Sequence, residues 1–217
     1  RKRGNINMDG KVVGRIFFWN IIALAILTIV FHKCFGMPLT VEQLNQAAVD
    51  RTRENIMYSP QYVEIDYPNG DVPDHTGVCT DVIIRAYRAV GVDLQQLVHE
   101  DMLANFEEYP SKQIWGLNKP DSNIDHRRVP NLQIFFERNG EKLDITFNPD
   151  DYKPGDIVVW GGFRNGSSPW HIGIVVKGNS IMTGNPFVVH NIGYGPERED
   201  MLFDFPIIGH YRYYPEV

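Results

Sequence analysis

The sequence of 217 residues predicts an α+β domain in which N-terminal helices pack on an antiparallel β-sheet. Three observations lead to this prediction. Apolar residues recur at helical spacing up to about residue 140. Beyond Lys142, short strand-like runs are separated by turns rich in Gly, Asn and Pro. The connections between neighbouring runs are short, as antiparallel pairing allows.

Charge is unevenly spread along the chain. The net charge is −6, but residues 1–33 hold six basic residues and one acidic residue, Asp9. The rest therefore holds 15 basic and 26 acidic residues, a net charge of −11. A nucleic-acid partner needs a basic face, so the acidic body argues against nucleic-acid binding.

An uncharged apolar run over residues 16–31 predicts a single transmembrane anchor over about residues 16–35. Basic residues precede the run, so the positive-inside rule places residues 1–15 in the cytoplasm and residues 36–217 in the periplasm. A cleaved signal peptide is the alternative. Small residues are missing from the usual cleavage positions, which favours an uncleaved anchor in the inner membrane. Met8 is an alternative start of the protein.

Four helices are predicted after the anchor, each from helical spacing and a terminal signal. Residues 40–43 form a capping box that opens the first helix. Gly91 stops the second, and Pro110 ends the third. Pro130 opens the fourth, as proline often does in the first turn. The predicted helices cover residues 40–55, 79–90, 94–109 and 130–139.

Four strands are predicted in the second half, at residues 156–160, 171–176, 187–192 and 207–214. They are expected to form a meander. Strand alternation places His171 and Gly173 on one face of their strand, whereas Ile172 and Ile174 form a core face. Because Gly173 has no side chain, it is expected to leave room for another element to approach.

Cys79 is the one cysteine of the predicted periplasmic body apart from Cys34, which lies at the end of the anchor. A helical pattern begins directly after it. The dipole and free N–H groups of a helix N-terminus favour a thiolate, and exported domains usually pair their cysteines. The lone thiol is therefore either a nucleophile or a buried cysteine that acts as a small apolar side chain.

Two histidines on neighbouring predicted strands complete a catalytic hypothesis. His171 and His190 are both expected to face the N-terminus of the Cys79 helix. Cys79 would be the nucleophile, His171 the base and His190 the residue that orients its ring. The backbone N–H groups of Cys79 and Thr80 would contribute an oxyanion hole.

A metal site is the competing chemistry for these residues. The chain has neither a His-x-x-x-His pair nor a cysteine pair with the spacing of a zinc site, so no metal or other cofactor is predicted. The polar run Asp125-His126-Arg127-Arg128 has two interpretations. It either binds a substrate carboxylate through an arginine fork or forms a solvated loop with local ion pairs.

Three motifs resemble the papain-like, NlpC-type cell-wall cysteine peptidases and their CHAP relatives. Tyr67 followed by Gly77-Val78-Cys79-Thr80-Asp81 is similar to the entry into the family's catalytic helix. Residues 154–160, Pro-Gly-Asp-Ile-Val-Val-Trp, match a family strand, and residues 171–175, His-Ile-Gly-Ile-Val, match the strand that carries its histidine. The resemblance implies a papain-like fold, with Cys79, His171 and His190 as the catalytic residues and Tyr67 as a helper at the oxyanion site.

A closer resemblance, over about residues 40–215, is to a bacterial envelope family known as the YijF-like domain of unknown function. It rests on residues 77–81, 99–102, 123–132 and 209–213. The chain departs from the NlpC pattern in Thr80-Asp81, which replaces Ser-Gly, and in an insertion at about residues 93–153. The longer turn before His190 leaves Asn191 as an alternative orienting residue.

Two functions follow from this sequence. The first is a membrane-anchored, periplasmic thiol hydrolase that cleaves amide bonds, with the stem peptides of peptidoglycan as its expected substrate. The second is an inactive module on the same fold that binds the cell wall or an envelope protein, with Asp125–Arg128 as its contact surface.

Overall fold

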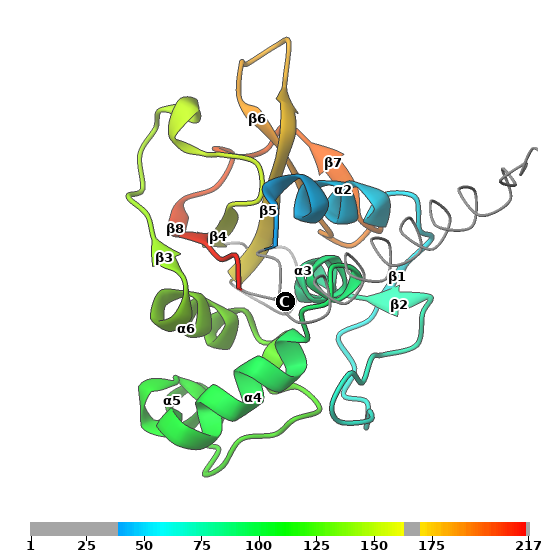
Figure 1. Ribbon diagram of the computed structural model, residues 1–217, viewed down its shortest axis with the longest axis vertical. Helices are drawn as coiled ribbons and strands as arrows, with labels where there is room; N and C mark the ends of the chain where they lie inside the picture. The colour runs from blue at the N-terminus through cyan, green and yellow to red at the C-terminus, as the bar shows by residue number, and fades with distance from the viewer. Residues whose placement is uncertain (1–38, 163–169, 216–217) are drawn as a thin grey trace, which may run out of the picture. The chain divides into compact units, whose positions relative to one another are not determined.

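The computed structural model describes residues 39–162 and 170–215 (Figure 1). Leu39–Pro215 form one compact unit. The predicted cytoplasmic tail and the anchor at residues 16–35 lie outside the described residues. In the described part of the chain, no helix has the length and apolar character needed to cross a bilayer.

The helices of the unit follow the predicted order. Thr40 accepts a hydrogen bond from the Gln43 N–H, and the Gln43 side chain accepts one from the Thr40 N–H, so the predicted capping box is confirmed. The first helix ends at Arg51, earlier than predicted. The helices are α2 (Val41–Arg51), α3 (Cys79–Ala89), α4 (Leu94–Asn105), α5 (Ser111–Trp115) and α6 (Val129–Asn139), with short 3₁₀ turns at Phe106–Glu108, Asp125–Arg127 and Pro149–Asp151.

In the described residues, six strands form an antiparallel sheet in the order β3-β8-β4-β5-β6-β7. Strands β4, β5 and β6 run as the predicted meander, and β7, which was not predicted, extends it. The fourth predicted strand, β8, does not follow β6 in the sheet as expected but pairs with the other edge of β4. Two very short strands, β1 (Met57–Tyr58) and β2 (Thr76–Gly77), pair in parallel beside α3. The strands of the sheet are β3 (Glu141–Lys142), β4 (Ile157–Gly161), β5 (Trp170–Asn179), β6 (Pro186–His190), β7 (Glu197–Glu199) and β8 (Ile207–Arg212).

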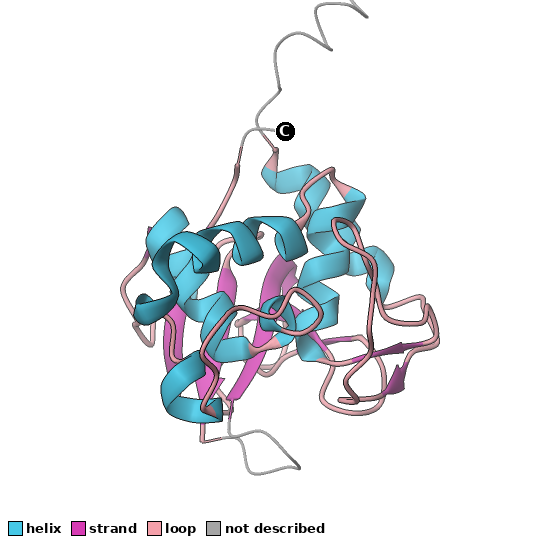
Figure 2. Cartoon of the chain, turned by 90° about the horizontal axis from the view of Figure 1, so that it is seen from below, coloured by secondary structure: helices cyan, strands magenta, loops and turns pink. Residues whose placement is uncertain are grey.

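Each face of the sheet has its own core. Ile172 and Ile174 pack with the buried residues of α2, α3 and α6, and Figure 2 shows the helices gathered on one side of the strands. Val158, Trp160 and Val175 pack on the other face with side chains of the C-terminal segment. The predicted core face of β5 is therefore confirmed, and the fold is α+β with helices on an antiparallel sheet.

Candidate active site

Helix α3 presents Cys79 at its first position. The N–H of Val78, which precedes the helix, donates to the Asp81 carboxylate at 2.7 Å, so Asp81 caps the helix start. Every residue from Cys79 to Tyr87 is buried, so α3 lies in the middle of the domain. The predicted helix start at Cys79 is confirmed.

The Cys79 thiol lies against the backbone of β5. The ladder between β5 and β6 has its last pair at Ile174 and Val189, and β6 ends at His190. Just beyond this point, the backbone N–H of Ile172 approaches the sulfur and favours its charged form, as do the N–H groups of Thr80 and Cys79. The thiol therefore contacts β5 at Ile172, the residue after His171. At this position β5 no longer pairs with β6.

The effect of burial on the pKa of the Cys79 thiol is larger than the effect of these N–H groups. Cys79 is only 5% exposed, and its burial, with the nearby Asp81 carboxylate, raises the pKa of the thiol to about 12. The expectation that the helix N-terminus would favour a thiolate is wrong for this resting structure, because desolvation penalises the charged form more than the N–H groups stabilise it. The thiol is neutral at neutral pH.

Arg127, which is 46 residues further along the chain, binds Asp81 at the start of α3. Its Nε and Nη2 donate to the two oxygens of Asp81 at 2.8 and 2.9 Å, and both side chains are about 3% exposed. The Thr80 hydroxyl donates to the Arg127 carbonyl at 3.1 Å. Thr80 and Asp81, which replace the Ser-Gly of the NlpC pattern, thus tie α3 to the turn at residues 125–127.

The two histidines form the predicted pair. Nε2 of His171 on β5 lies 2.9 Å from Nδ1 of His190 at the end of β6. Burial lowers the pKa of His171 to about 3 and that of His190 to about 4, so both rings are neutral at neutral pH. Nε2 of His190 lies 2.9 Å from a carboxylate oxygen of Glu199 but is not aligned for a hydrogen bond.

Trp160 fills the space that Gly173 leaves. His171 stacks on the Trp160 ring at 5.5 Å between centroids, and a Cβ on Gly173 would lie 3.0 Å from two atoms of that ring. Trp160 belongs to the core on the face away from the helices. The predicted room beside Gly173 is therefore taken by the tryptophan of the neighbouring strand, whereas the start of α3 contacts the backbone of Ile172.

A pocket of about 270 Å³ opens at Cys79. Tyr58 of β1 lines it, and burial together with the nearby Cys79 and Asp81 raises the pKa of Tyr58 to about 12. Its hydroxyl is therefore protonated and available as a donor. Sequence patterns carry little signal for Tyr58, because β1 has only two residues. The pocket is lined by Tyr58, Pro60, Val78, Cys79, Trp115, Ile124, Arg127, Arg128, Val129, Pro130 and Trp170.

Tyr67 and Asn191 do not have the positions expected of them. Tyr67 is 42% exposed and packs edge-on against His99, and it is not among the residues that line the Cys79 pocket. The side-chain oxygen of Asn191 accepts the N–H groups of Gly193 and Gly195, so Asn191 shapes the turn after β6. His190, and not Asn191, contacts the His171 ring.

The polar run Asp125–Arg128 is not a solvated loop. Asp125, His126 and Arg127 are all buried, and burial lowers the pKa of His126 to about 3. Arg128 bonds to Asp125 at 2.6 Å and lies 4.4 Å above the Trp115 ring. Arg127 and Arg128 both line the Cys79 pocket, which brings this run to the candidate site.

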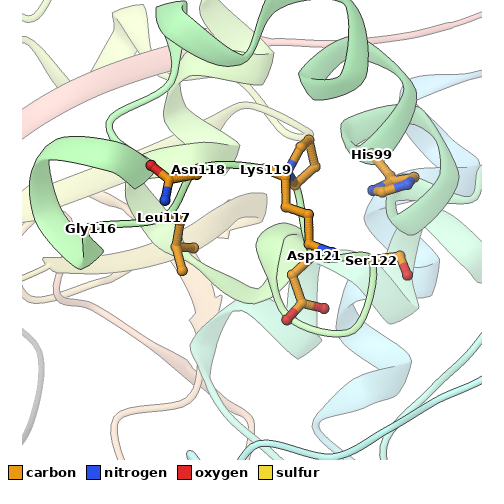
Figure 3. A pocket seen from close by; sticks show the side chains of 8 residues that line it. His99, Gly116, Leu117, Asn118, Lys119, Asp121 and Ser122 are labelled. Carbon is orange, nitrogen blue, oxygen red and sulfur yellow. The ribbon is translucent and has the colours of Figure 1, made fainter.

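A second pocket lies apart from the thiol. It measures about 620 Å³ and is formed by His99 of α4 and the loop 116–122 (Figure 3). It shares no lining residue with the Cys79 pocket. Within residues 39–162 and 170–215, no cluster of three or more His, Cys, Asp or Glu side chains is arranged to hold a metal ion.

Comparison with known proteins places the chain in a family. The model of a domain of unknown function, DUF1287, matches residues 45–213. The chain belongs to the DUF1287 family. The uncharacterised protein YijF of Escherichia coli strain K12 is 50% identical over 190 residues, which cover 84% of this chain and 90% of YijF. The predicted resemblance to the YijF-like family is confirmed.

Solved structures similar to this DUF1287 protein have low sequence identity. NlpC1 from Trichomonas vaginalis is 15% identical with a TM-score of 0.42; the match covers 80% of this chain but 45% of NlpC1, so the chain spans less than half of that protein. An N-acetylmuramoyl-L-alanine amidase from Bacteroides uniformis is 12% identical with a TM-score of 0.47, and the match covers 81% of this chain and 99% of the amidase.

Proposed function

We propose that this DUF1287 protein is a thiol-dependent amide hydrolase of the bacterial cell envelope that cleaves the stem peptides of peptidoglycan. The observation that carries the proposal is the position of Cys79: a lone thiol at a helix start, in contact with the backbone beside His171, whose ring is held by His190. The NlpC-like motifs around Cys79 and His171 support the same chemistry. Residues 16–35 would anchor the domain at the periplasmic face of the inner membrane.

The reaction would start from a neutral thiol and a neutral imidazole. As the sulfur attacks the carbonyl carbon of the amide, its proton passes to His171. Nε2 of His171 contacts His190, so Nδ1 is the nitrogen assigned to the proton. Because the low pKa of His171 keeps the ring unprotonated, the base is in its competent form from neutral pH well into the acid range.

The negative charge that develops on the carbonyl oxygen would be met by the N–H groups at the start of α3 and by the Tyr58 hydroxyl. Collapse of the tetrahedral intermediate breaks the C–N bond, and His171 returns the proton to the leaving amine. Water then attacks the thioester with His171 again accepting a proton, which releases the carboxylic acid and restores the thiol.

The proposal is tested with the purified full chain and peptidoglycan sacculi, by chromatography of the released fragments and detection of new amino groups. Cys79→Ala is expected to abolish release, and His171→Gln to reduce it about 10²- to 10⁴-fold. Arg138→Gln, a substitution at the end of α6 that does not line the Cys79 pocket, serves as the control for general damage. Release of fragments by Cys79→Ala at the level of the unmodified protein would refute the proposal.

The alternative function is a catalytically inactive module that binds the cell wall or an envelope protein. The buried thiol with its raised pKa favours this reading, because a structural cysteine shows the same features. Sedimentation with sacculi separates the two functions. Binding without release of fragments, unchanged in Cys79→Ala, would identify the binding module.

A further inference from the structure

The Cys79 pocket has an unbalanced set of lining charges. Its described lining includes two arginines, Arg127 and Arg128, and no acidic residue. Two helix starts also reach it: α3 through Cys79, and α6 through Val129 and Pro130. The N-terminus of a helix carries partial positive charge, so the two helix starts favour an anion, whereas Asp81 and Asp125 behind the lining balance much of the arginine charge.

The two arginines differ in what remains of their hydrogen-bonding capacity. Arg127 gives Nε and Nη2 to Asp81 and makes longer contacts from Nη1 and Nη2 to the carbonyls of Gln61 and Ser59. Its side chain is 3% exposed. Its charge is balanced by Asp81 and its donors are occupied, so Arg127 supports the helix start and has nothing left for a ligand.

Arg128 has hydrogen-bond donors that are not used by the described residues. In the described part of the chain, its side chain donates only from Nη1, to Asp125 at 2.6 Å. The side chain is 18% exposed, and its guanidinium lies over the Trp115 ring. Stacking on the ring and the bond to Asp125 fix the plane of the guanidinium, while Nε and Nη2 remain for a second planar acceptor. A guanidinium with one fixed edge suits a bidentate carboxylate.

We infer that Arg128 is a specificity-determining residue that binds a carboxylate of the substrate close to the scissile amide. The inference rests on the proposed function and narrows its substrate to peptides with a free carboxylate near the cleaved bond. Asp125 and Trp115 hold the guanidinium in place before the ligand arrives, so less conformational entropy is lost on binding. The neutral, buried thiol adds no negative charge to repel the ligand.

The inference is tested by binding, without turnover, in a full-length Cys79→Ala protein. The probes are the stem tetrapeptide L-Ala-γ-D-Glu-L-Lys-D-Ala and two versions in which either the α-carboxylate of D-Glu or the C-terminal carboxylate is a carboxamide. Calorimetry gives each dissociation constant. One of the two amidations is expected to weaken binding about tenfold to a hundredfold, the range for a hydrogen-bonded charged pair.

Three substitutions on that background assign the effect to Arg128. Arg128→Gln should remove the preference, so that the acid binds no better than its carboxamide. Arg128→Lys keeps the charge but not the fork and should retain part of the preference. Arg138→Gln is the matched control: Arg138 lies at the other end of α6, also bonds an aspartate, Asp101, and does not line the pocket. It should bind as the parent does.

The outcomes separate this inference from the proposed function. Equal binding of all three peptides, or no binding of any, overturns the carboxylate inference, as does a preference that survives in a folded Arg128→Gln protein. In each case, Cys79-dependent release of fragments from sacculi would still support the proposed hydrolase function. Conversely, a carboxylate preference that depends on Arg128, in a protein that releases nothing from sacculi, would support carboxylate binding by Arg128 but refute the hydrolase and, with it, the position of the carboxylate beside a scissile amide.

Discussion

The thiol contacts the backbone of Ile172, the residue after His171, but the thiol and the histidine pair are held in different ways. His171 and His190 lie on adjacent strands, and neighbouring strands and Trp160 fix them. Cys79 is held by residues far away in the sequence, chiefly Arg127 through Asp81. The sheet region is therefore self-contained, whereas the thiol region depends on contacts between distant segments. The predictions below test whether the two regions are as independent as this difference implies.

The largest expected effect is on the reactivity of the thiol. Because burial raises the pKa of Cys79 from 9.0 to about 12, its thiolate fraction at neutral pH should be about 10³-fold below that of an unperturbed cysteine. Alkylation by iodoacetamide should be correspondingly slow and rise about tenfold per pH unit through pH 9. Mass spectrometry of a Cys34→Ser protein isolates the rate at Cys79. Labelling of the urea-unfolded chain is the reference, and a plateau below pH 8.5 would show that the thiolate is stabilised after all.

The next effect concerns the support of the thiol region. Arg127→Met leaves the Asp81 carboxylate buried without its partner, which should cost about 3–5 kcal/mol of unfolding free energy. Urea unfolding measures the loss. Arg138→Met breaks a more exposed pair with Asp101 and should cost about 1 kcal/mol or less. Equal losses in the two variants would mean that the Asp81–Arg127 pair does not support the thiol region.

The burial of the thiol and its support by Arg127 could not be predicted from the sequence. The helix start at Cys79, the capping box at Thr40 and the strands of His171 and His190 are local patterns, and they were predicted. Asp81 and Arg127 are 46 residues apart, and only the folded chain shows that they meet. The same holds for Tyr58, which replaces Tyr67 at the pocket, and for Glu199, which reaches His190 from a three-residue strand.

The pKa of the thiol could not be read from the sequence either. A helix N-terminus favours the thiolate, whereas burial opposes it, and the balance depends on how deeply the surrounding segments cover the sulfur. The occupant of the space beside Gly173 could not be predicted from the sequence for a related reason. Alternation correctly separated Ile172 from His171, but it could not show that Trp160, from the neighbouring strand, would occupy the space above Gly173.

Acidification should weaken the histidine region. Burial lowers the pKa of His190 to about 4, below its value of about 6.5 in the unfolded chain. The unfolded state therefore binds more protons between these values, and stability is lost as the pH falls from 6.5 towards 4. At pH 5 the loss is about 2 kcal/mol for this histidine. Urea unfolding at pH 7.5 and pH 5 measures it, and His190→Gln should remove that share. An unchanged pH dependence in His190→Gln would contradict the assignment.

A steric test addresses the packing of the same region. In Gly173→Ala the new Cβ would meet two atoms of the Trp160 ring at 3.0 Å and the Val189 carbonyl oxygen at 3.2 Å. Overpacking of this kind costs about 1–3 kcal/mol. Trp160→Phe in the same chain should relieve part of the cost, so the two substitutions should be coupled in a double-mutant cycle. Purely additive losses would show that Trp160 is not what restricts residue 173.

The smallest effect on the unfolding free energy is expected at Glu199, which contacts His190 but not the thiol region. Its carboxylate is 44% exposed, and the neighbouring His190 ring is neutral at neutral pH, so the 2.9 Å contact is not an ion pair there. Glu199→Gln should change the unfolding free energy by less than about 0.5 kcal/mol at pH 7.5. The change should grow below pH 5, because protonated His190 would lose a partner of opposite charge. A loss of more than about 1 kcal/mol at pH 7.5, with no further loss on acidification, would mean that Glu199 supports the histidine pair as a hydrogen-bond acceptor rather than as a charge.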